Sequence, residues 1–342
     1  MRRALVTGAT GLVGSHIVER LLRDGWQVRA LARNVETSRS VLPDDVKVHR
    51  GDVLDERSFA AAAQGCEVVF HTAANILVRG GWEAYRATNI DGTRNAIAAA
   101  ERASARLLQL SSVAVYGPSA RYAAAERGER TTEDAPLASL RPTAYYARSK
   151  RESEEMVMAA HAAGRIWATA VRPCVIYGPR DRQFVPRMAV LIRRGFIPLL
   201  RDGRSTMAVV HAANVADGAV MAATSEVAGG RAFNLSNDFD VTVREFFDYA
   251  GIGLDRKPRY VPLPMWLARG ILRTTRAIAK VLTGGKFSLV SGAALDFISR
   301  DNPFSSDRAR RELGWSPRVQ PGIGIPGAFQ SWQEAHNKKG AT

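Results

Sequence analysis

Tyr146 and Lys150 place a phenol and an ammonium four residues apart in a stretch with helical spacing. Residues four apart lie on one face of a helix, so the two groups would be neighbours. A free tyrosine has a pKa of about 10, and a nearby cation favours the phenolate, which suits acid/base work near neutral pH. Tyr145 lies five residues before Lys150 and would point elsewhere. Ser112 follows an apolar stretch upstream, so we predict that Ser112, Tyr146 and Lys150 form a catalytic group.

Three glycines recur at intervals of three residues between an apolar stretch over 3–7 and a helical pattern over 12–23. Glycine allows a tight turn in which backbone N–H groups approach a pyrophosphate, and the N-terminus of the next helix faces the anion. The position between a strand and a helix makes the pattern more specific than its spacing alone. We expect the cofactor phosphates to be bound by Gly8, Thr10, Gly11, Leu12, Val13 and Gly14.

The residue after the second expected strand, over 27–32, bears on the choice of dinucleotide. A site for NAD usually carries an acidic residue there for the ribose 2′-hydroxyl, whereas this chain has Arg33. Arg33 can pair with a 2′-phosphate, which favours NADP(H); a plain surface arginine is the alternative. Asp52 and Val53 follow the third strand, where Asp52 can accept from an adenine amine or simply cap a turn.

Strands and helices alternate through the first half of the chain, which predicts parallel βαβ units and an α/β fold with a doubly wound parallel Rossmann sheet. We assign residues 1–172 to a dinucleotide-binding domain and residues 173–342 mainly to a smaller C-terminal substrate-binding lobe, interleaved with the core. The polar stretch over 117–141 predicts a loop. Apolar stretches predict strands over 3–7, 27–32, 46–50, 67–71, 106–110, 166–171, 206–210 and 231–234, and helical patterns cover 12–23, 56–63, 83–102, 143–163, 214–223 and 243–249.

The composition narrows the class of protein. The 342 residues are 46% hydrophobic and 24% charged, which excludes a wholly disordered, collagen-like or disulfide-stapled chain. Cys66 and Cys174 lie far apart, so we expect no metal site. The net charge of +15 comes from scattered arginines without a DNA- or RNA-binding motif, so we expect no nucleic-acid partner. The absence of a long apolar stretch and of a signal-peptide pattern predicts a cytoplasmic protein.

Further motifs extend over nearly the whole chain. They occupy residues 7–14, 51–53, 71–74, 89–93, 111–117, 146–150, 172–179 and 304–317. With these motifs the chain resembles an extended short-chain dehydrogenase/reductase of the NAD-dependent epimerase/dehydratase type. The run Arg-Pro-Cys-Val-Ile-Tyr-Gly-Pro over 172–179 is most similar to the 3β-hydroxysteroid dehydrogenase-like subgroup.

The resemblance implies roles for individual residues. Ser112 would orient the substrate carbonyl, Tyr146 would be the acid/base, and Lys150 would hold the nicotinamide ribose and tune Tyr146. Hydride would pass between nicotinamide C4 and a substrate carbon while Ser112 hydrogen-bonds the developing oxyanion. A homodimer through the helices over 83–102 and 143–163 is the expected assembly. Further cofactor contacts would come from Ala73, Ala74, Pro173 and Val175.

Members of this family divide into sugar-nucleotide epimerases or dehydratases and reductases of apolar alcohols and ketones. Sugar-nucleotide enzymes usually carry asparagine where this chain has Cys174, and dehydratases often carry an acid where it has Val113. We therefore expect an NADP(H)-dependent oxidoreductase that interconverts a secondary alcohol and a ketone on a sterol-like or long-chain β-keto substrate. The alternatives are an NDP-sugar epimerase or dehydrogenase and a non-enzymatic NADP-binding regulator. Candidate substrate contacts are Ile76, Val113, Cys174 and Phe184, with core packing as the other interpretation.

Residues 256–295 contain eight basic residues and no acidic one. A helix expected over 262–282 would have an apolar side with Trp266, Leu267 and Ile271 beside a basic side. Such a helix can cover an apolar substrate or lie in a membrane interface. We favour the lid and keep peripheral membrane contact as the alternative.

Overall fold

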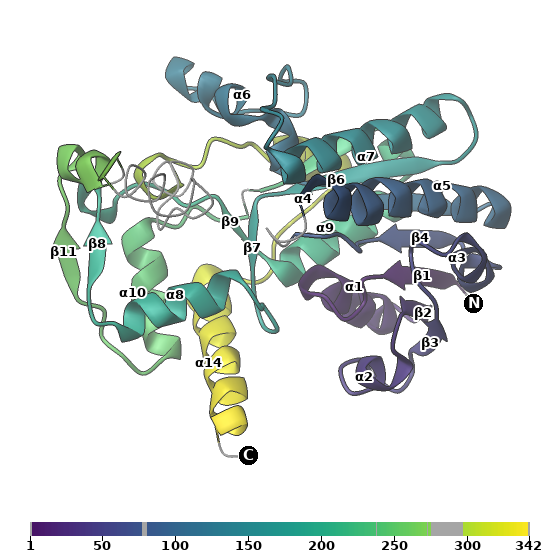
Figure 1. Ribbon diagram of the computed structural model, residues 1–342, viewed down its shortest axis with the longest axis horizontal. Coiled ribbons are helices and arrows are strands. Elements are labelled where there is room, and N and C mark those ends of the chain that lie inside the picture. Colours follow the sequence, from purple (N-terminus) through teal and green to yellow (C-terminus); the bar gives the residue numbers. More distant parts are fainter. Residues whose placement is uncertain (1, 77–80, 237, 272, 275–296, 341–342) are drawn as a thin grey trace. The chain divides into compact units, whose positions relative to one another are not determined.

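The computed structural model describes residues 2–76, 81–236, 238–271, 273–274 and 297–340 (Figure 1). The chain divides into two compact units. The first contains residues 1–176, 210–238 and 304–319, and the second contains 177–209, 239–303 and 320–342. The second half of the chain therefore supplies two segments to the first unit as well as building the second unit.

The first unit is built on a parallel sheet in which seven described strands follow the order β10-β6-β5-β4-β1-β2-β3. This order confirms the predicted doubly wound α/β fold, in which ligands bind at the carboxyl ends of the strands where the order reverses. Here the reversal lies between β1 and β4, and Thr7 pairs with His71 across it. The strands are β1 (Arg3–Thr7), β2 (Gln27–Ala32), β3 (Lys47–Arg50), β4 (Val68–His71), β5 (Arg106–Leu110), β6 (Ala168–Pro173) and β10 (Ala232–Leu235).

The two faces of this sheet bury two separate cores, because side chains alternate across a strand. Ala4 and Val6 pack in the core of α1 (Leu12–Arg23) and α9 (Ala212–Thr224). Leu5 packs in the opposite core, which is completed by α3 (Glu56–Ala63), α5 (Gly92–Ala103) and α7 (Tyr145–Ala162). The unit also contains α2 (Val35–Arg39), α4 (Gly81–Tyr85), η1 (Arg86–Asp91), η2 (Val113–Tyr116), α6 (Pro118–Ala123), η3 (Ala125–Arg127), η5 (Glu226–Ala228) and α13 (Asp307–Leu313).

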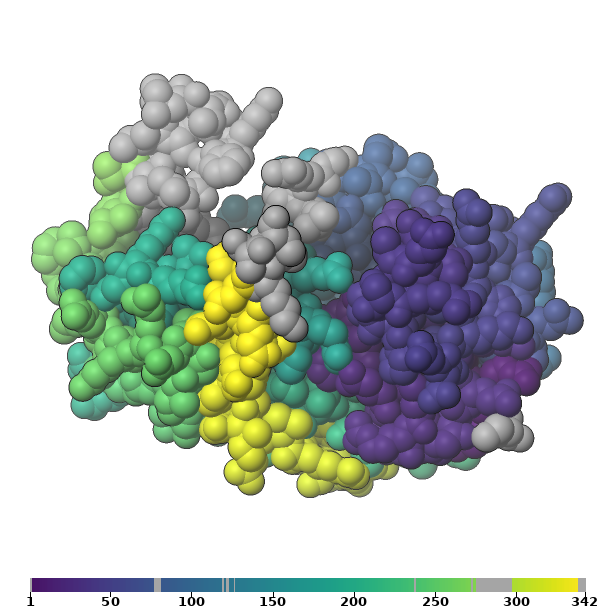
Figure 2. Space-filling model, turned by 90° about the horizontal axis from the view of Figure 1, so that it is seen from below, coloured from purple at the N-terminus to yellow at the C-terminus, as the bar shows by residue number. Residues whose placement is uncertain are grey.

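The second unit is built around aromatic side chains. The Phe246 ring on α10 (Val243–Gly253) lies 5.6 Å from the Phe184 ring on α8 (Phe184–Arg193) and 6.0 Å from the Phe329 ring on α14 (Pro321–Gly340). Helix α14 packs on α10 and leaves much of its outer side exposed (Figure 2). The unit also contains the parallel strands β8 (Ile197–Leu199) and β11 (Tyr260–Pro262) and the turn η4 (Arg201–Gly203); β7 (Val175–Tyr177) and β9 (Val209–His211) lie where the chain passes between the units.

Three predicted elements need correction. The helix predicted over 83–102 is divided into α4, a π-helical turn (η1) and α5. In this wider turn the buried Asn89 side chain is hydrogen-bonded to the backbone of Asn75. The loop over 117–141 contains α6, whose Pro118 suits a first helical position. The helix over 262–282 begins later, since 260–262 form β11; its described helical residues are 265–271 and 273–274, and the rest lies outside the described residues.

Candidate active site

The glycine turn after β1 leaves no room for side chains. Gly8 has a φ of +65°, and its carbonyl accepts a 2.8 Å hydrogen bond from the N–H of Gly11. A Cβ on Gly14 would lie 2.2 Å from the carbonyl oxygen of Gly8, far inside van der Waals contact. Gly11 is also the N-cap of α1 and offers no side-chain cap, so the first N–H groups of the helix remain available to an anion. Leu12 and Val13 begin α1, and the Val13 side chain packs in the core, so only its backbone can face an anion. The glycine turn fits a dinucleotide pyrophosphate; the contacts of Thr10, Leu12 and Val13 with it remain predictions.

The segment after β4 is tied directly to this turn. The Thr72 hydroxyl donates a 2.6 Å bond to the carbonyl of Thr7, and the Ala73 N–H donates a 3.2 Å bond to the Thr7 hydroxyl. A Cβ on Gly8 would lie 2.8 Å from the Ala73 nitrogen. Ala73, and Ala74 after it, therefore border the glycine turn where the strand order reverses.

The two residues expected at the adenosine end are half-buried or exposed. Arg33 is exposed directly after β2 and makes no ion pair within the described part of the chain. The Asp52 carboxylate accepts from the N–H of Leu54 at 3.0 Å, as a turn aspartate does, which leaves its other oxygen open. The carbonyl of Val53 accepts from Asn95 at 2.9 Å. Their roles toward a nucleotide remain predictions.

The side chains of Ser112 and Tyr146 lie close together. Ser112 is buried as the N-cap of η2, where its oxygen accepts from the N–H of Ala114 at 3.2 Å. The Tyr146 phenol lies in the first turn of α7. Burial raises the pKa of Tyr146, and the nearby Ser112 hydroxyl opposes this rise. The phenol is therefore a proton donor at neutral pH.

Tyr145 has a different environment from Tyr146. Its ring lies 6.2 Å from the Trp82 ring and 6.2 Å from the Tyr85 ring. The Tyr85 ring also lies 6.5 Å from the Tyr146 ring, so the contact with Trp82 is what distinguishes the environment of Tyr145.

Lys150 is buried one turn after Tyr146, and its ammonium donates a 2.7 Å bond to the carbonyl of Leu110 at the end of β5. Burial lowers the pKa of Lys150 to about 8, and the carboxylate of Glu154 opposes this change. The expectation that Lys150 would shift Tyr146 toward the phenolate is not met in this structure. Burial raises the pKa of the phenol, and the Lys150 ammonium is bound to the carbonyl of Leu110 instead.

His71 lies beneath these groups at the end of β4. Its Nδ1 is 2.9 Å from the Thr7 hydroxyl, and its Nε2 has no hydrogen-bond partner among the described residues. Burial, together with the charge of Lys150, lowers the pKa of His71 to about 3. The imidazole is consequently neutral and adds no second cation beside Lys150.

The four candidate substrate contacts have dissimilar surroundings. Ile76 is 49% exposed, whereas Val113 is buried. The Cys174 thiol lies 3.4 Å from the carbonyl of Ser236, and its side chain packs against the core under α1 and α9. Phe184 belongs to the second unit, where its ring lies 6.2 Å from the Phe297 ring. Residues 77–78 lie outside the described residues.

Two other expected contacts lie close to Cys174 in the chain. Pro173 is buried at the end of β6, and Val175 is half-buried at the start of β7. Their contact with a nicotinamide remains a prediction.

The sequence motifs contained Asn89 without a role for it. Its side-chain oxygen accepts from the N–H of Asn75 at 2.6 Å, and its amide donates to the Asn75 carbonyl at 3.0 Å and to the Ser149 hydroxyl at 2.9 Å. Asn89 therefore joins the segment after β4 to the helix that carries Tyr146. Its position inside a helical pattern gave no sign of the π-helical turn that orients it.

The described residues contain no group of three or more His, Cys, Asp or Glu side chains that could hold a metal ion. Within the same residues, every helix is too short or too polar to cross a membrane.

Comparisons with known proteins agree with the fold and the motifs. Residues 4–236 match the model of the NAD dependent epimerase/dehydratase family. A 4-hydroxy-2-methyl-3-oxo-4-farnesyl-3,4-dihydroquinoline-1-oxide ketoreductase from Stigmatella aurantiaca is 27% identical over 330 residues, which are 96% of each chain. A 2-alkyl-3-oxoalkanoate reductase from Shewanella oneidensis is 31% identical over 321 residues, which cover 86% of this chain and 81% of the relative.

The fold also matches solved structures. UDP-glucuronic acid 4-epimerase from Bacillus cereus, in complex with NAD, superposes with a TM-score of 0.73 over 98% of this chain and 99% of that chain, at 18% identity. The family model covers more than half of the chain, and the motifs named above extend beyond it. The chain therefore belongs to the NAD dependent epimerase/dehydratase family.

Proposed function

We propose that the protein is an NADP(H)-dependent oxidoreductase that interconverts a secondary alcohol and a ketone on an apolar substrate. The observation that carries this proposal is the buried group of Ser112 at the start of η2, Tyr146 in the first turn of α7 and Lys150 one turn further along the same helix, with its ammonium bound to Leu110. All three residues belong to the unit that contains the glycine turn. Family membership makes the protein an NAD(P)-dependent enzyme.

The described residues account for the proton transfer in the proposed reaction. A bound nicotinamide would supply or accept the hydride. In reduction, Tyr146 donates its phenolic proton to the oxygen of the former carbonyl, and in oxidation it takes the hydroxyl proton back. Ser112 hydrogen-bonds the same oxygen and stabilises the charge that develops there. Lys150 keeps a positive charge beside the phenol as the proton leaves.

An apolar substrate is supported by the relatives and by two residues. The relatives are named for reduction of a farnesyl-bearing ketone and of 2-alkyl-3-oxoalkanoates. At the two positions where sugar-nucleotide enzymes use a carboxylate or a carboxamide, this chain has Val113 and Cys174, which carry neither group. The NDP-sugar epimerase or dehydrogenase stays the alternative, favoured by the likeness in fold to UDP-glucuronic acid 4-epimerase. A non-enzymatic regulator is disfavoured because Ser112, Tyr146 and Lys150 are all present.

The preference for NADP(H) over NAD(H) rests on Arg33. Its guanidinium is exposed beyond the end of β2, where a 2′-phosphate of a bound dinucleotide would lie in this fold. A guanidinium can bind such a phosphate through two parallel hydrogen bonds.

The test is cofactor-dependent turnover of 2-alkyl-3-oxoalkanoates, 3-oxosteroids and UDP-sugars by the purified chain. We expect NADPH-dependent reduction of a ketone in the first two groups. Tyr146→Phe should slow this reduction by roughly 10²–10⁴-fold, because a general acid usually contributes that much to the rate. The affinity for NADPH should be retained. Tyr145→Phe is the matched control and should remain active. Turnover of UDP-sugars alone, or an inactive Tyr145→Phe beside an active Tyr146→Phe, would contradict the proposal.

Peripheral membrane contact and a homodimer are further proposals. The second unit has 19 basic and 9 acidic residues, a net charge of +10, against +5 for the larger first unit. It also exposes 74% of Trp266 and 43% of Ile271. Basic and aromatic side chains together favour an anionic lipid surface.

The homodimer would use α5 and α7, and analytical ultracentrifugation of the purified chain tests it.

A further inference from the structure

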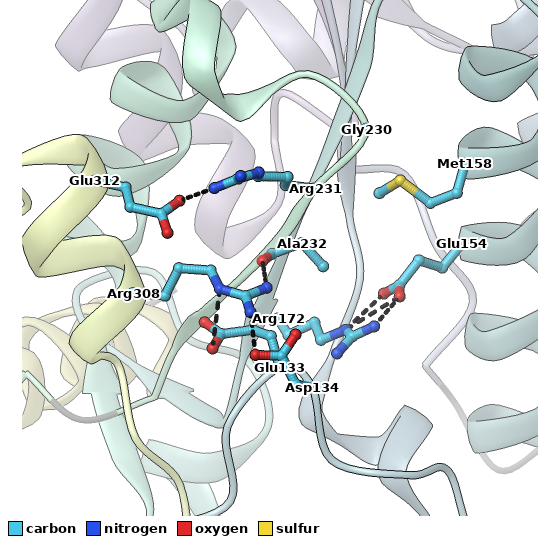
Figure 3. A pocket seen from close by; sticks show the side chains of 10 residues that line it. All are labelled: Glu133, Asp134, Glu154, Met158, Arg172, Gly230, Arg231, Ala232, Arg308 and Glu312. Carbon is cyan, nitrogen blue, oxygen red and sulfur yellow. Dashed lines mark hydrogen bonds and ion pairs between the residues drawn. The ribbon is translucent and has the colours of Figure 1, made fainter.

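A buried ion pair lies behind the candidate active site. Arg172 on β6 donates from its Nε to both carboxylate oxygens of Glu154 on α7, each at 3.1 Å (Figure 3). The two side chains are only 9% and 8% exposed. Glu154 lies one helical turn after Lys150 and two turns after Tyr146. The pair therefore fixes the helix that carries both groups to the neighbouring strand.

Arg172 also holds the segment that begins at Ser112. Its Nη1 donates a 2.9 Å bond to the hydroxyl of Tyr116, the last residue of η2. The Tyr116 hydroxyl in turn donates a 2.9 Å bond to the side-chain oxygen of Asn234 on β10. The Tyr116 ring stacks on Phe304 with a centroid distance of 5.8 Å. One guanidinium thus joins the element that starts with Ser112 to the helix that starts with Tyr145 and Tyr146.

The surrounding pocket, about 450 Å³ in volume, is better explained as part of this structure than as a ligand site (Figure 3). Each of its three arginines already has a carboxylate partner: Arg172 pairs with Glu154, Arg231 with Glu312, and Arg308 with Glu133 and Asp134. Among the lining residues no cation is left for an anionic ligand. Of the three arginines, Arg172 is bound to the elements that carry the candidate catalytic residues.

We propose that Glu154, Arg172 and Tyr116 are positioning residues: Arg172 holds η2 and α7 together so that Ser112 and Tyr146 keep their relative positions, and Glu154 keeps the neighbouring Lys150 charged. This inference rests on the proposed oxidoreductase function. None of the three residues has to touch the substrate. Their effect comes from geometry, because a displacement of about 1 Å can cost a hundredfold in rate, and from charge, because a carboxylate favours the protonated form of a nearby amine.

The charges around Lys150 assign this role to Glu154. His71 faces Lys150 from β4 and is neutral, since its pKa is lowered to about 3. On α7, Tyr146 is uncharged at neutral pH because its pKa is raised, and the Glu154 carboxylate opposes the lowering of the Lys150 pKa by burial. The adjacent Arg151 binds the carbonyls of Val115 and Ala138. Arg172 on β6 faces the far side of Glu154. The Glu154 carboxylate is accordingly the anion that offsets the burial of the ammonium.

The experiment compares Glu154→Gln with Glu155→Gln, which removes the same charge from the next, exposed residue of α7. In wild type, kcat/KM should fall as Lys150 loses its proton. In Glu154→Gln the decrease of kcat/KM should occur at a pH lower by about one unit, because a neighbouring opposite charge shifts a pKa by at least about that much. Glu155→Gln should keep the wild-type profile, and Glu154→Asp should restore most of it. Superposable profiles for the two glutamine variants would overturn the inference.

Tyr116→Phe tests the geometric part without leaving a buried ion unpaired. It keeps the ring that stacks on Phe304 and removes the hydroxyl that Arg172 and Asn234 bind. We expect kcat to fall about tenfold, within the range that a misplaced reacting group costs, with the KM for the ketone and the affinity for NADPH unchanged. A wild-type kcat in Tyr116→Phe would refute the link between η2 and α7. The Tyr116→Phe variant also keeps the inference testable if Glu154→Gln does not fold.

NMR titration of isotope-labelled lysine side chains separates this inference from the proposed function. The chain has seven lysines, and Lys150→Arg identifies the signal of Lys150. A lower Lys150 pKa in Glu154→Gln than in Glu155→Gln supports the charge role even if no tested substrate turns over. An unchanged Lys150 pKa would overturn that role in an enzyme that is fully active.

Discussion

Gly14→Ala should weaken binding of the dinucleotide strongly while leaving the protein folded. The added methyl carbon would lie 2.2 Å from the carbonyl oxygen of Gly8, 2.8 Å from its carbonyl carbon and 2.9 Å from the Thr72 hydroxyl. Two of these atoms belong to the backbone, and Gly8 is held by its bond to Gly11. Ordinary contact begins near 3.4 Å, so the turn has to open by about 1 Å. Overpacking of this kind costs roughly 1–3 kcal/mol of stability.

The effect on the cofactor should exceed the effect on stability. Opening the turn moves the N–H groups at the start of α1 away from the pyrophosphate. Each hydrogen bond to a charged group contributes about 1.5–3 kcal/mol, so the loss of one or two weakens NADPH binding by roughly tenfold to 20,000-fold. Isothermal titration with NADPH measures this loss, and thermal denaturation checks the fold.

Gly327→Ala is the matched control, because nothing lies within 4 Å of a Cβ placed there. Alanine is also the better helix former, so this variant should keep its stability and its NADPH affinity. Wild-type affinity in folded Gly14→Ala would refute the assignment of this turn to the cofactor.

Three further outcomes are expected. Arg33→Asp should lower the affinity for NADPH roughly tenfold to a hundredfold and leave NADH affinity unchanged or higher; titration of both cofactors checks this, and an unchanged preference counts against Arg33. Activity should fall as pH rises through about 8, because burial lowers the pKa of Lys150 to about 8 and the ammonium is lost above it; a pH–rate profile that stays level to pH 10 would contradict the role of Lys150. The chain should co-sediment with anionic liposomes at low salt and be released at high salt, with weaker binding in Trp266→Ala; binding that does not respond to salt, or none, would exclude the electrostatic membrane contact.

The elements of the first unit were predictable because they arise from local sequence. Strands β1, β2 and β5 and helices α1 and α3 have the bounds that the apolar patterns predict. A short apolar run followed by glycines and a helical pattern needs no distant partner to be recognised. By contrast, the π-helical turn at Arg86–Asp91 depends on hydrogen bonds of Asn89 to Asn75 and Ser149, which lie 14 and 60 residues away in the chain. A pattern of helical spacing contains no information on such a contact.

The sequence by itself determined the family, the doubly wound sheet and the two motifs whose residues are close in the chain: the glycine turn and the spacing of Tyr146 and Lys150. Only the tertiary structure decided that the Lys150 ammonium binds the carbonyl at the end of β5. It also decided that Arg172 joins η2 to α7. The physical reason is range: helical spacing and turn chemistry act over a few residues, whereas burial and hydrogen bonds between strands and helices depend on packing across the whole sheet.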